Sequence, residues 1–387
     1  MRSILIVLDS LGIGAAPDAD HYGDRGADTL GHLFARNPEL ALPALFSMGL
    51  GEVLAGGWRE GAGVRACYGR MRVRSPGKDS VTGHWEMAGL ILKETFTVFE
   101  KLPPQLVDAI EAAANVRFLG AGGGLRREQW KEHAATGRPV IGLLAGESAI
   151  EITAHETVIS RRRLYEIGRI ARRQADAYRI ARIVTQPLTG KAGAYVEGTG
   201  RHEYRMVPPR TVLNAISEAG LGVEGIGKVA DIFARSGVTH AHAARTNAEA
   251  LEAIERVWER MDDGLIFANV GDFDRFGHAR DVPGYAGALG RFDRWLADFL
   301  PKVGRDDLLI ITADHGNDPA FRGKDHTREE VPLLAHYDGM AGPLGTRDTL
   351  ADIGATLAEF FRLEGWRGPG VPFLKFRRPP GGGRLGW

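Results

Sequence analysis

The sequence has a single cysteine, no net charge and no long apolar run. One cysteine, Cys67, excludes an internal disulfide and fits a protein of a reducing compartment. Lys plus Arg and Asp plus Glu both number 49, so no global basic field would draw the chain to nucleic acid or to an anionic membrane. No apolar stretch reaches the roughly 18 residues of a bilayer-spanning helix, and the run at the start of the chain is too short for a signal peptide. We therefore expect a cytoplasmic protein without nucleic-acid, membrane or obligate protein partners.

Short β-branched runs alternate along the chain with segments whose apolar residues recur every three or four positions. Such runs fit strands buried on both faces, and the intervening spacing is typical of amphipathic helices. The alternation predicts an α/β fold with a doubly wound, mostly parallel sheet. Residues 97–206 differ in character, and we interpret them as an inserted α+β cap domain. The expected organisation is a core domain from residues 1–96 and 207–376, the cap at 97–206, and a disordered tail at 377–387 rich in Arg, Pro and Gly.

Six side chains with oxygen or imidazole donors follow the expected strands at 4–8, 265–270 and 308–312, directly or on a nearby loop. They are Asp9, Asp274, His278, Asp314, His315 and His326. In parallel α/β sheets, ligands bind at the carboxyl ends of the strands. Three carboxylates and three histidines match a pair of divalent ions ~4 Å apart. The mixed oxygen and nitrogen donors favour Mn²⁺ or Zn²⁺ over Mg²⁺ alone.

The polar segment at residues 75–89, SPGKDSVTGHWEMAG, offers a nucleophile. Ser80 would stand at the head of a helix, where the amino terminus favours a bound phosphate. A metal pair would lower the pKa of its hydroxyl, because a serine near pH 7 is otherwise a weak nucleophile. The combination of metals and hydroxyl predicts phosphoryl transfer.

Each of these positions has a structural alternative. Ser80 would look the same as a helix N-cap, and Asp9 would serve as a cap for the element that follows it. The pair Asp314 and His315 fits a strand end followed by a turn. Lys228, at the end of an expected strand at 222–226, suits an anionic ligand or a solvated surface.

Residues 1–363 resemble the phosphopentomutase family of the alkaline phosphatase superfamily. The two most specific runs are GKDSVTGHWE at 77–86 and TADHGNDP at 312–319. The other matching runs are LDSLGIG at 8–14, APDA at 16–19, AHE at 154–156, IGK at 226–228, DFD at 272–274, DHTRE at 325–329 and ADIGAT at 351–356.

The resemblance implies interconversion of ribose or deoxyribose 1-phosphate and 5-phosphate. It implies that Ser80 carries the phosphoryl group, that a sugar bisphosphate is both intermediate and activator, and that the cap excludes water. It also implies two Mn²⁺ ions, one held by Asp9, Asp314 and His315 and the other by Asp274, His278 and His326. The residues expected to bind the sugar phosphate are Arg182, Arg201, Lys228 and Glu147.

The chain departs from the family pattern in places. Serine stands at position 80 where the family usually has threonine, and Thr82 is a neighbouring, weaker candidate for the nucleophile. The segment after Asp274 is one residue shorter than expected. Residues 120–126 and 145–149 differ from the family's cap motifs, which leaves the preferred sugar open. Alternative functions are a metal-dependent phosphatase, a mutase acting on a different sugar phosphate, and a non-catalytic sugar-phosphate binding protein.

Overall fold

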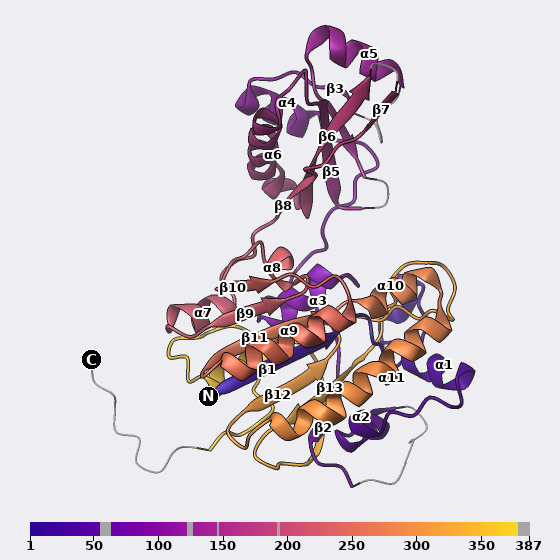
Figure 1. The fold of residues 1–387 in the computed structure, drawn as a ribbon, viewed down its shortest axis with the longest axis vertical. Coiled ribbons are helices and arrows are strands. Elements are labelled where there is room, and N and C mark those ends of the chain that lie inside the picture. The colour runs from indigo at the N-terminus through magenta and orange to yellow at the C-terminus, as the bar shows by residue number, and fades with distance from the viewer. Residues whose placement is uncertain (55–62, 122–126, 145–146, 192–193, 378–387) are drawn as a thin grey trace. The chain divides into compact units, whose positions relative to one another are not determined.

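The structure is a computed structural model that describes residues 1–54, 63–121, 127–144, 147–191 and 194–377 (Figure 1). The chain divides into two compact units, which we call the core unit and the inserted unit. The core unit comprises Met1–Glu94 and the chain from Pro208 onward, and the inserted unit comprises Thr95–Val207. Of the tail predicted to be disordered, residues 378–387 lie outside the described residues. Within the described chain, no helix combines the length and hydropathy needed to cross a membrane.

The core unit is built on a twisted sheet of eight described strands in the order β10-β9-β11-β1-β12-β13-β2-β14. The strands are β1 (Arg2–Leu8), β2 (Cys67–Met71), β9 (Val223–Ile226), β10 (His240–His242), β11 (Gly264–Val270), β12 (Leu308–Thr312), β13 (Val331–His336) and β14 (Gly342–Arg347). All neighbours pair in parallel except that β13 runs antiparallel to β12 and β2. The predicted α/β fold with a mostly parallel sheet is thus confirmed.

Helices cover the central strands, because these strands are apolar on both faces. Every residue of β11 and β12 is buried, as expected for strands made of Leu, Ile, Val, Phe and Ala. Helices α9 and α11 cross the sheet in the foreground of Figure 1, and α12 packs against α3 and α7. The helices of this unit are α1 (Thr29–Arg36), α2 (Pro43–Ser47), α3 (Ser80–Met87), α7 (Val212–Glu218), α8 (Val229–Ile232), α9 (Asn247–Arg260), α10 (Asp272–Ala279), α11 (Val282–Phe299) and α12 (Ala351–Phe360), with short 3-10 helices at Ala19–Tyr22, Leu50–Val53 and Leu300–Lys302.

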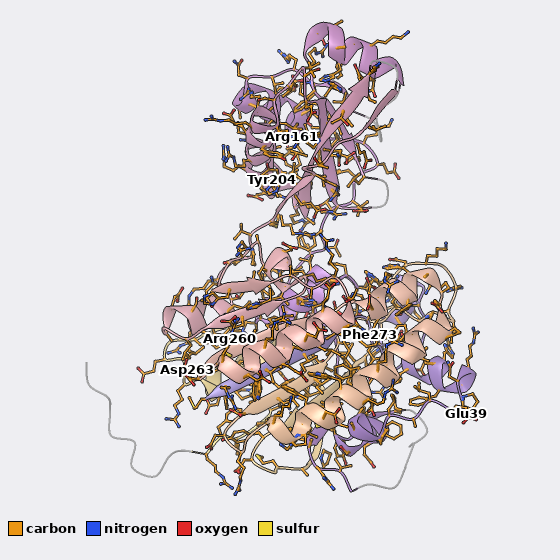
Figure 2. All side chains as sticks on the ribbon, in the orientation of Figure 1. Glu39, Arg161, Tyr204, Arg260, Asp263 and Phe273 are labelled. Atoms are coloured by element: carbon orange, nitrogen blue, oxygen red, sulfur yellow. The ribbon has the colours of Figure 1, made fainter. Side chains whose placement is uncertain are left out.

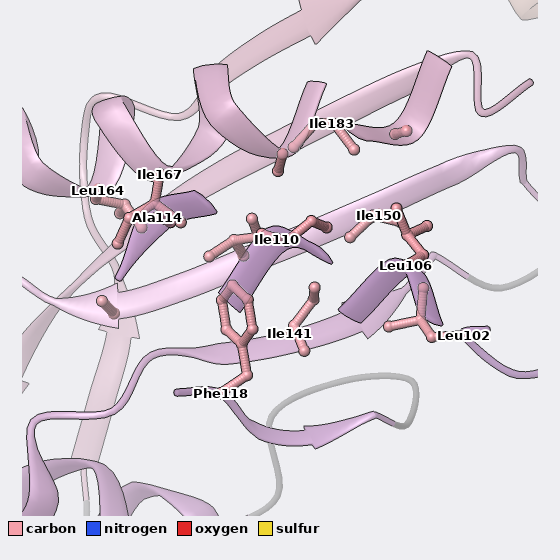
Figure 3. Packing of buried hydrophobic residues seen from close by; sticks show 14 of the residues in the cluster. Leu102, Leu106, Ile110, Ala114, Phe118, Ile141, Ile150, Leu164, Ile167 and Ile183 are labelled. Atoms are coloured by element: carbon pink, nitrogen blue, oxygen red, sulfur yellow. The ribbon is translucent and has the colours of Figure 1, made fainter. Parts of the chain in front are cut away.

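The inserted unit has its own sheet and its own core. Its strands are β3 (Leu119–Ala121), β4 (Val140–Leu143), β5 (Ala149–His155), β6 (Arg182–Lys191), β7 (Ala194–Glu197) and β8 (His202–Arg205), and its helices are α4 (Pro104–Ala114), α5 (Arg127–Thr136), α6 (Arg161–Ala175) and a 3-10 turn at Asp176–Tyr178. Figure 3 shows a cluster of buried apolar side chains that includes Leu106 and Ile110 of α4, Leu164 and Ile167 of α6, and Ile183 of β6. These five side chains are 0–1% exposed, so the unit buries a continuous apolar core that does not involve the larger sheet.

The inserted unit is expected to lose stability as the pH falls. The Nε2 atom of buried His133 accepts the amide N–H of His155 at 2.9 Å, and Nδ1 donates to the carbonyl of Arg138 at 2.6 Å, so the ring must be neutral. Burial lowers the pKa of His133 below its ordinary value. The unfolded chain therefore binds a proton at a pH where the folded chain does not, and the free energy of unfolding falls as the pH drops below about 6.5.

Urea unfolding at about pH 7.5 and about pH 5.5 measures this effect, given an unfolded pKa near 6.5. His133→Gln is expected to show a smaller loss of stability between the two values than the wild type, because glutamine does not titrate. Equal losses in the two proteins would contradict the prediction.

Candidate metal centre and nucleophile

Asp9 and Asp314 lie side by side because they follow paired parallel strands. Val7 of β1 pairs with Thr312 of β12, so both strands end at the same edge of the sheet. Ser10 has a φ of 71°, which turns the chain sharply just after Asp9. The amide of Ser10 then donates to Oδ1 of Asp314 at 3.0 Å and joins the two strand ends.

Asp274 and His278 lie one turn apart on α10, which starts two residues after β11, the other neighbour of β1. At this spacing they share one helix face, and His278 Nε2 is 3.4 Å from Asp274 Oδ1. Phe273, labelled in Figure 2, is buried and packs against Tyr285 with ring centroids 5.4 Å apart. Tyr285 in turn donates to the carbonyl of Ser10 at 3.1 Å, which fixes α10 against the turn that follows Asp9. The segment after Asp274, although one residue shorter than expected for the family, therefore still places the carboxylate of Asp274 beside the imidazole of His278.

His315 and His326 complete the group. Their rings stack with centroids 4.0 Å apart. His326 Nε2 is 3.1 Å from Asp274 Oδ1, and His315 Nε2 is 3.3 Å from Asp314 Oδ2 and 3.7 Å from Asp9 Oδ1. The structure thus brings all six predicted donors to one place. Two sets each have donor atoms within 4.8 Å of one another: Asp9, Asp314 and His315, and Asp274, His315 and His326.

The donor atoms are arranged as metal ligands usually are. His278 donates from Nδ1 to the carbonyl of Lys324 at 2.7 Å, and His315 does so to Gly316 at 3.1 Å, which leaves each Nε2 with a lone pair. The Nε2 atoms of His278 and His326 face each other at 3.0 Å, an arrangement that a cation between them would satisfy. Oδ1 of Asp9 is buried without a hydrogen bond from any described residue. These features fit divalent cations.

The carboxylates differ in pKa because their neighbours differ. Burial and the charge of Asp314 raise the pKa of Asp9 to about 7, although Lys228 acts against the shift. Burial alone would also raise the pKa of Asp274, but the contacts with the imidazoles of His278 and His326 hold it well below its ordinary value. Two crowded, buried carboxylates at Asp9 and Asp314 leave negative charge that bound cations would offset.

Ser80 presents its hydroxyl to this group. The N-cap of α3 is Asp79, whose Oδ1 accepts the amide of Thr82 at 3.0 Å, so the interpretation of Ser80 as the cap is wrong. The hydroxyl of Thr82 is 1% exposed and donates to Asp79 Oδ2 at 2.6 Å. Ser80 Oγ instead lies 3.1 Å from His315 Nε2 and 2.7 Å from Lys228 Nζ. Of the two candidate hydroxyls, only that of Ser80 faces the metal-type donors.

Lys228 is part of the site and not a solvated surface lysine. It follows β9, and its ammonium forms an ion pair with Asp9 while donating to Ser80. Burial alone would lower the pKa of Lys228, but the charges of Asp9 and Asp314 raise it above its ordinary value. The lysine therefore stays charged beside the candidate nucleophile.

His84 is a residue of the site that the sequence analysis did not assign. Its ring is fully buried, with Nδ1 2.8 Å from the carbonyl of Ser80 and 3.2 Å from Asp314 Oδ2. Nε2 faces the amide nitrogen of Asn269 at 3.3 Å, so Nε2 accepts and Nδ1 carries the proton. His84 therefore supports both Ser80 and Asp314. Its position four residues after Ser80, on the same helix face, was the available signal.

The other predicted substrate-binding residues lie in the inserted unit. Arg182 of β6 forms ion pairs with Glu147 and, at 3.2 Å, with Glu203. Arg201 contacts the same Glu203 at 2.5 Å. Arg182, Arg201 and Glu147 therefore belong to one cluster of ion pairs centred on Arg182 and Glu203. The divergent positions 122–126 and 145–146 lie outside the described residues.

The chain is similar in sequence to known proteins along nearly its whole length. The model of the metalloenzyme superfamily matches residues 1–365. The phosphopentomutase of Anaeromyxobacter dehalogenans strain 2CP-1 is 42% identical over 93% of this chain and 95% of its own. That of Deinococcus radiodurans is 42% identical over 96% of this chain and 99% of its own. Among solved structures, phosphoglycerate mutase of Leishmania mexicana aligns with a TM-score of 0.48 and 13% identity, over 95% of this chain and 97% of that one.

Identity at this level over nearly the whole length of both chains leaves no room for a match confined to one shared domain. The chain therefore belongs to the phosphopentomutase family of mutases.

Proposed function

We propose that the protein interconverts ribose or deoxyribose 1-phosphate and the corresponding 5-phosphate. Family membership supports the reaction. The observation that carries the proposal is the position of Ser80 Oγ, 3.1 Å from His315 and 2.7 Å from Lys228, beside two sets of metal-type donors. A hydroxyl held between a cation and metal ligands suits reversible capture of a phosphoryl group.

Asp9, Asp314 and His315 would hold one Mn²⁺ ion, and Asp274, His278 and His326 the other. When bound, the two ions would lower the pKa of the serine hydroxyl and neutralise charge on the transferring phosphoryl group. His315 belongs to both groups of neighbouring donor atoms, so its imidazole would be available to either ion.

In the proposed cycle, phosphorylated Ser80 meets a pentose monophosphate. A sugar hydroxyl attacks the phosphorus as the bond to Ser80 Oγ breaks, which gives a sugar bisphosphate and a free serine. The bisphosphate then reorients, and the phosphoryl group that the substrate brought is transferred to Ser80. The isomeric pentose monophosphate leaves as the product. The ammonium of Lys228 offsets charge on Oγ in both directions, and His84 holds the backbone of Ser80 in place.

A sugar bisphosphate would prime the unphosphorylated enzyme, since it donates a phosphoryl group to Ser80 without a prior cycle. We propose that Arg182, Arg201 and Glu147 bind the sugar phosphate, with the inserted unit serving to exclude water. Lys228 would act from the core unit.

The proposal is tested with purified protein stripped of metal by a chelator. The stripped protein is expected to be inactive, and added Mn²⁺ with a trace of pentose bisphosphate is expected to restore conversion of ribose 1-phosphate to ribose 5-phosphate. Sugar product and inorganic phosphate are measured together. Stoichiometric phosphate release without the isomeric sugar phosphate would indicate a phosphatase and contradict the proposal.

A further inference from the structure

A cavity of about 470 Å³ opens beside the candidate metal centre and is lined entirely by the core unit. Its wall includes Asp9, Asp274 and His278 on one hand and the cations Lys228, Arg245 and Arg275 on the other. The volume lies within the usual range for small-molecule sites, about 300–1,000 Å³. The proposed reaction uses Lys228 but assigns no role to the two arginines.

The two arginines differ in what already engages them. Arg275 donates to Asp272 Oδ1 at 2.9 Å, and its guanidinium lies over the ring of Phe276 at 4.6 Å. Arg245 is bound through its backbone, whose N–H donates to Glu249 Oε2 at 2.7 Å. Among the described residues, no hydrogen bond or ion pair engages the guanidinium of Arg245. The cavity therefore has one arginine available for a ligand.

The backbone that carries Arg245 is fixed relative to the metal-type donors. Asn247 donates its amide N–H to Asp272 Oδ2 at 2.8 Å, and Asp272 donates its own amide N–H to Asn247 Oδ1 at 2.7 Å. These reciprocal bonds join the start of α9, two residues after Arg245, to the start of α10, two residues before Asp274. The position of the Arg245 backbone relative to Asp274 is therefore fixed before a ligand binds, which lowers the entropy cost of binding compared with a free loop.

Resting on the proposed function, we propose that Arg245 binds the phosphate of the pentose phosphate that is not being transferred. A bisphosphate has two dianionic groups, and one must lie away from Ser80 while the other reacts. The guanidinium of Arg245, which no other described residue binds, shares a cavity with Lys228 and matches a phosphate monoester in charge and in donor geometry. Arg245 would thus select sugars with a second phosphate over those with one.

The test is a calorimetric titration of ribose 1,5-bisphosphate into the Mn²⁺-loaded Ser80→Ala protein, which cannot accept a phosphoryl group and therefore binds the ligand without turning it over. Adding Arg245→Gln is expected to raise the Kd by about tenfold to a hundredfold, the range for a hydrogen-bonded charge pair, and Arg245→Lys by less. Arg256→Gln is the matched control: Arg256 lies on α9, the helix that begins two residues after Arg245, and it is exposed and paired only loosely with Glu252 at 3.7 Å. It is expected to leave the Kd unchanged.

A Kd within about twofold of the parent for Arg245→Gln, or no saturable binding by the parent, would overturn the inference. The titration does not depend on turnover, so it separates two failures. Absence of mutase activity in the wild type would refute the proposed function, whereas an unchanged Kd would refute only the role of Arg245. Thermal melting of each variant shows whether it is folded.

Discussion

Replacing Ser80 with alanine is expected to lower the mutase kcat by at least about 10⁴-fold, the scale seen when a covalent nucleophile is removed. No other described hydroxyl is placed to substitute, because that of Thr82 is buried and bonded to Asp79. The measurement is the initial rate of ribose 1-phosphate conversion, together with incorporation of labelled phosphate from a pentose bisphosphate. Neither turnover nor labelled protein is expected for the variant.

Two matched variants sharpen this result. Ser80→Thr keeps the hydroxyl and is expected to keep labelling and turnover, since threonine is the family's usual residue at this position. Thr82→Val removes a hydroxyl two residues after Ser80 on the same helix. This variant is expected to lose some stability but to be labelled normally. Labelling that disappears in Thr82→Val and persists in Ser80→Ala would reverse the assignment of the nucleophile.

Replacing Arg328 with methionine is expected to lower the free energy of unfolding of the core unit by roughly 3–5 kcal/mol, because three backbone carbonyls lose their donors at about 1–3 kcal/mol each. Arg328 is 3% exposed and uses all five of its N–H donors. It binds both carboxylate oxygens of Asp18 and the carbonyls of Val73, Ser75 and Gly77. The variant would leave these three carbonyls without their partner.

Urea unfolding measures the loss, with Arg322→Met as the control. Arg322 lies on the same stretch of chain, but it is exposed, and it contacts the carbonyl of Gly23 and the ring of Phe321. Its replacement is expected to change the stability by less than about 0.5 kcal/mol. Because the segment bound by Arg328 leads directly to Ser80, the Arg328 variant is also expected to lose activity. Equal stabilities of the two variants would contradict the role given to Arg328.

The fold of the core unit and the six side chains of the candidate metal centre could both be predicted from the sequence. Apolar β-branched runs marked the central strands, and parallel pairing of β1 with β11 and β12 brought the residues after them to one edge. His326 was less accessible to this argument, because it follows no strand and reaches Asp274 only through the course of its loop. Its prediction depended on its place on a polar loop eleven residues after His315.

Other features depend on contacts between distant residues, which a local pattern does not encode. Ser80 and Asp79 are both good N-cap residues, and only the geometry shows that Asp79 accepts the amide of Thr82. Lys228 has the local sequence of a surface lysine, but the pairing of β9 with β11 places it against Asp9. The network of Arg328 spans more than 250 positions of sequence, and no spacing rule would reveal it.

The central claim is that the six gathered donors hold a pair of cations next to Ser80. Equilibrium binding of Mn²⁺ to metal-stripped protein tests it most directly. We predict two ions per wild-type chain, and one in the double variant His278→Ala and His326→Ala, which keeps Asp9, Asp314 and His315. A wild-type chain that binds fewer than two ions, or a double variant that still binds two, would contradict the account.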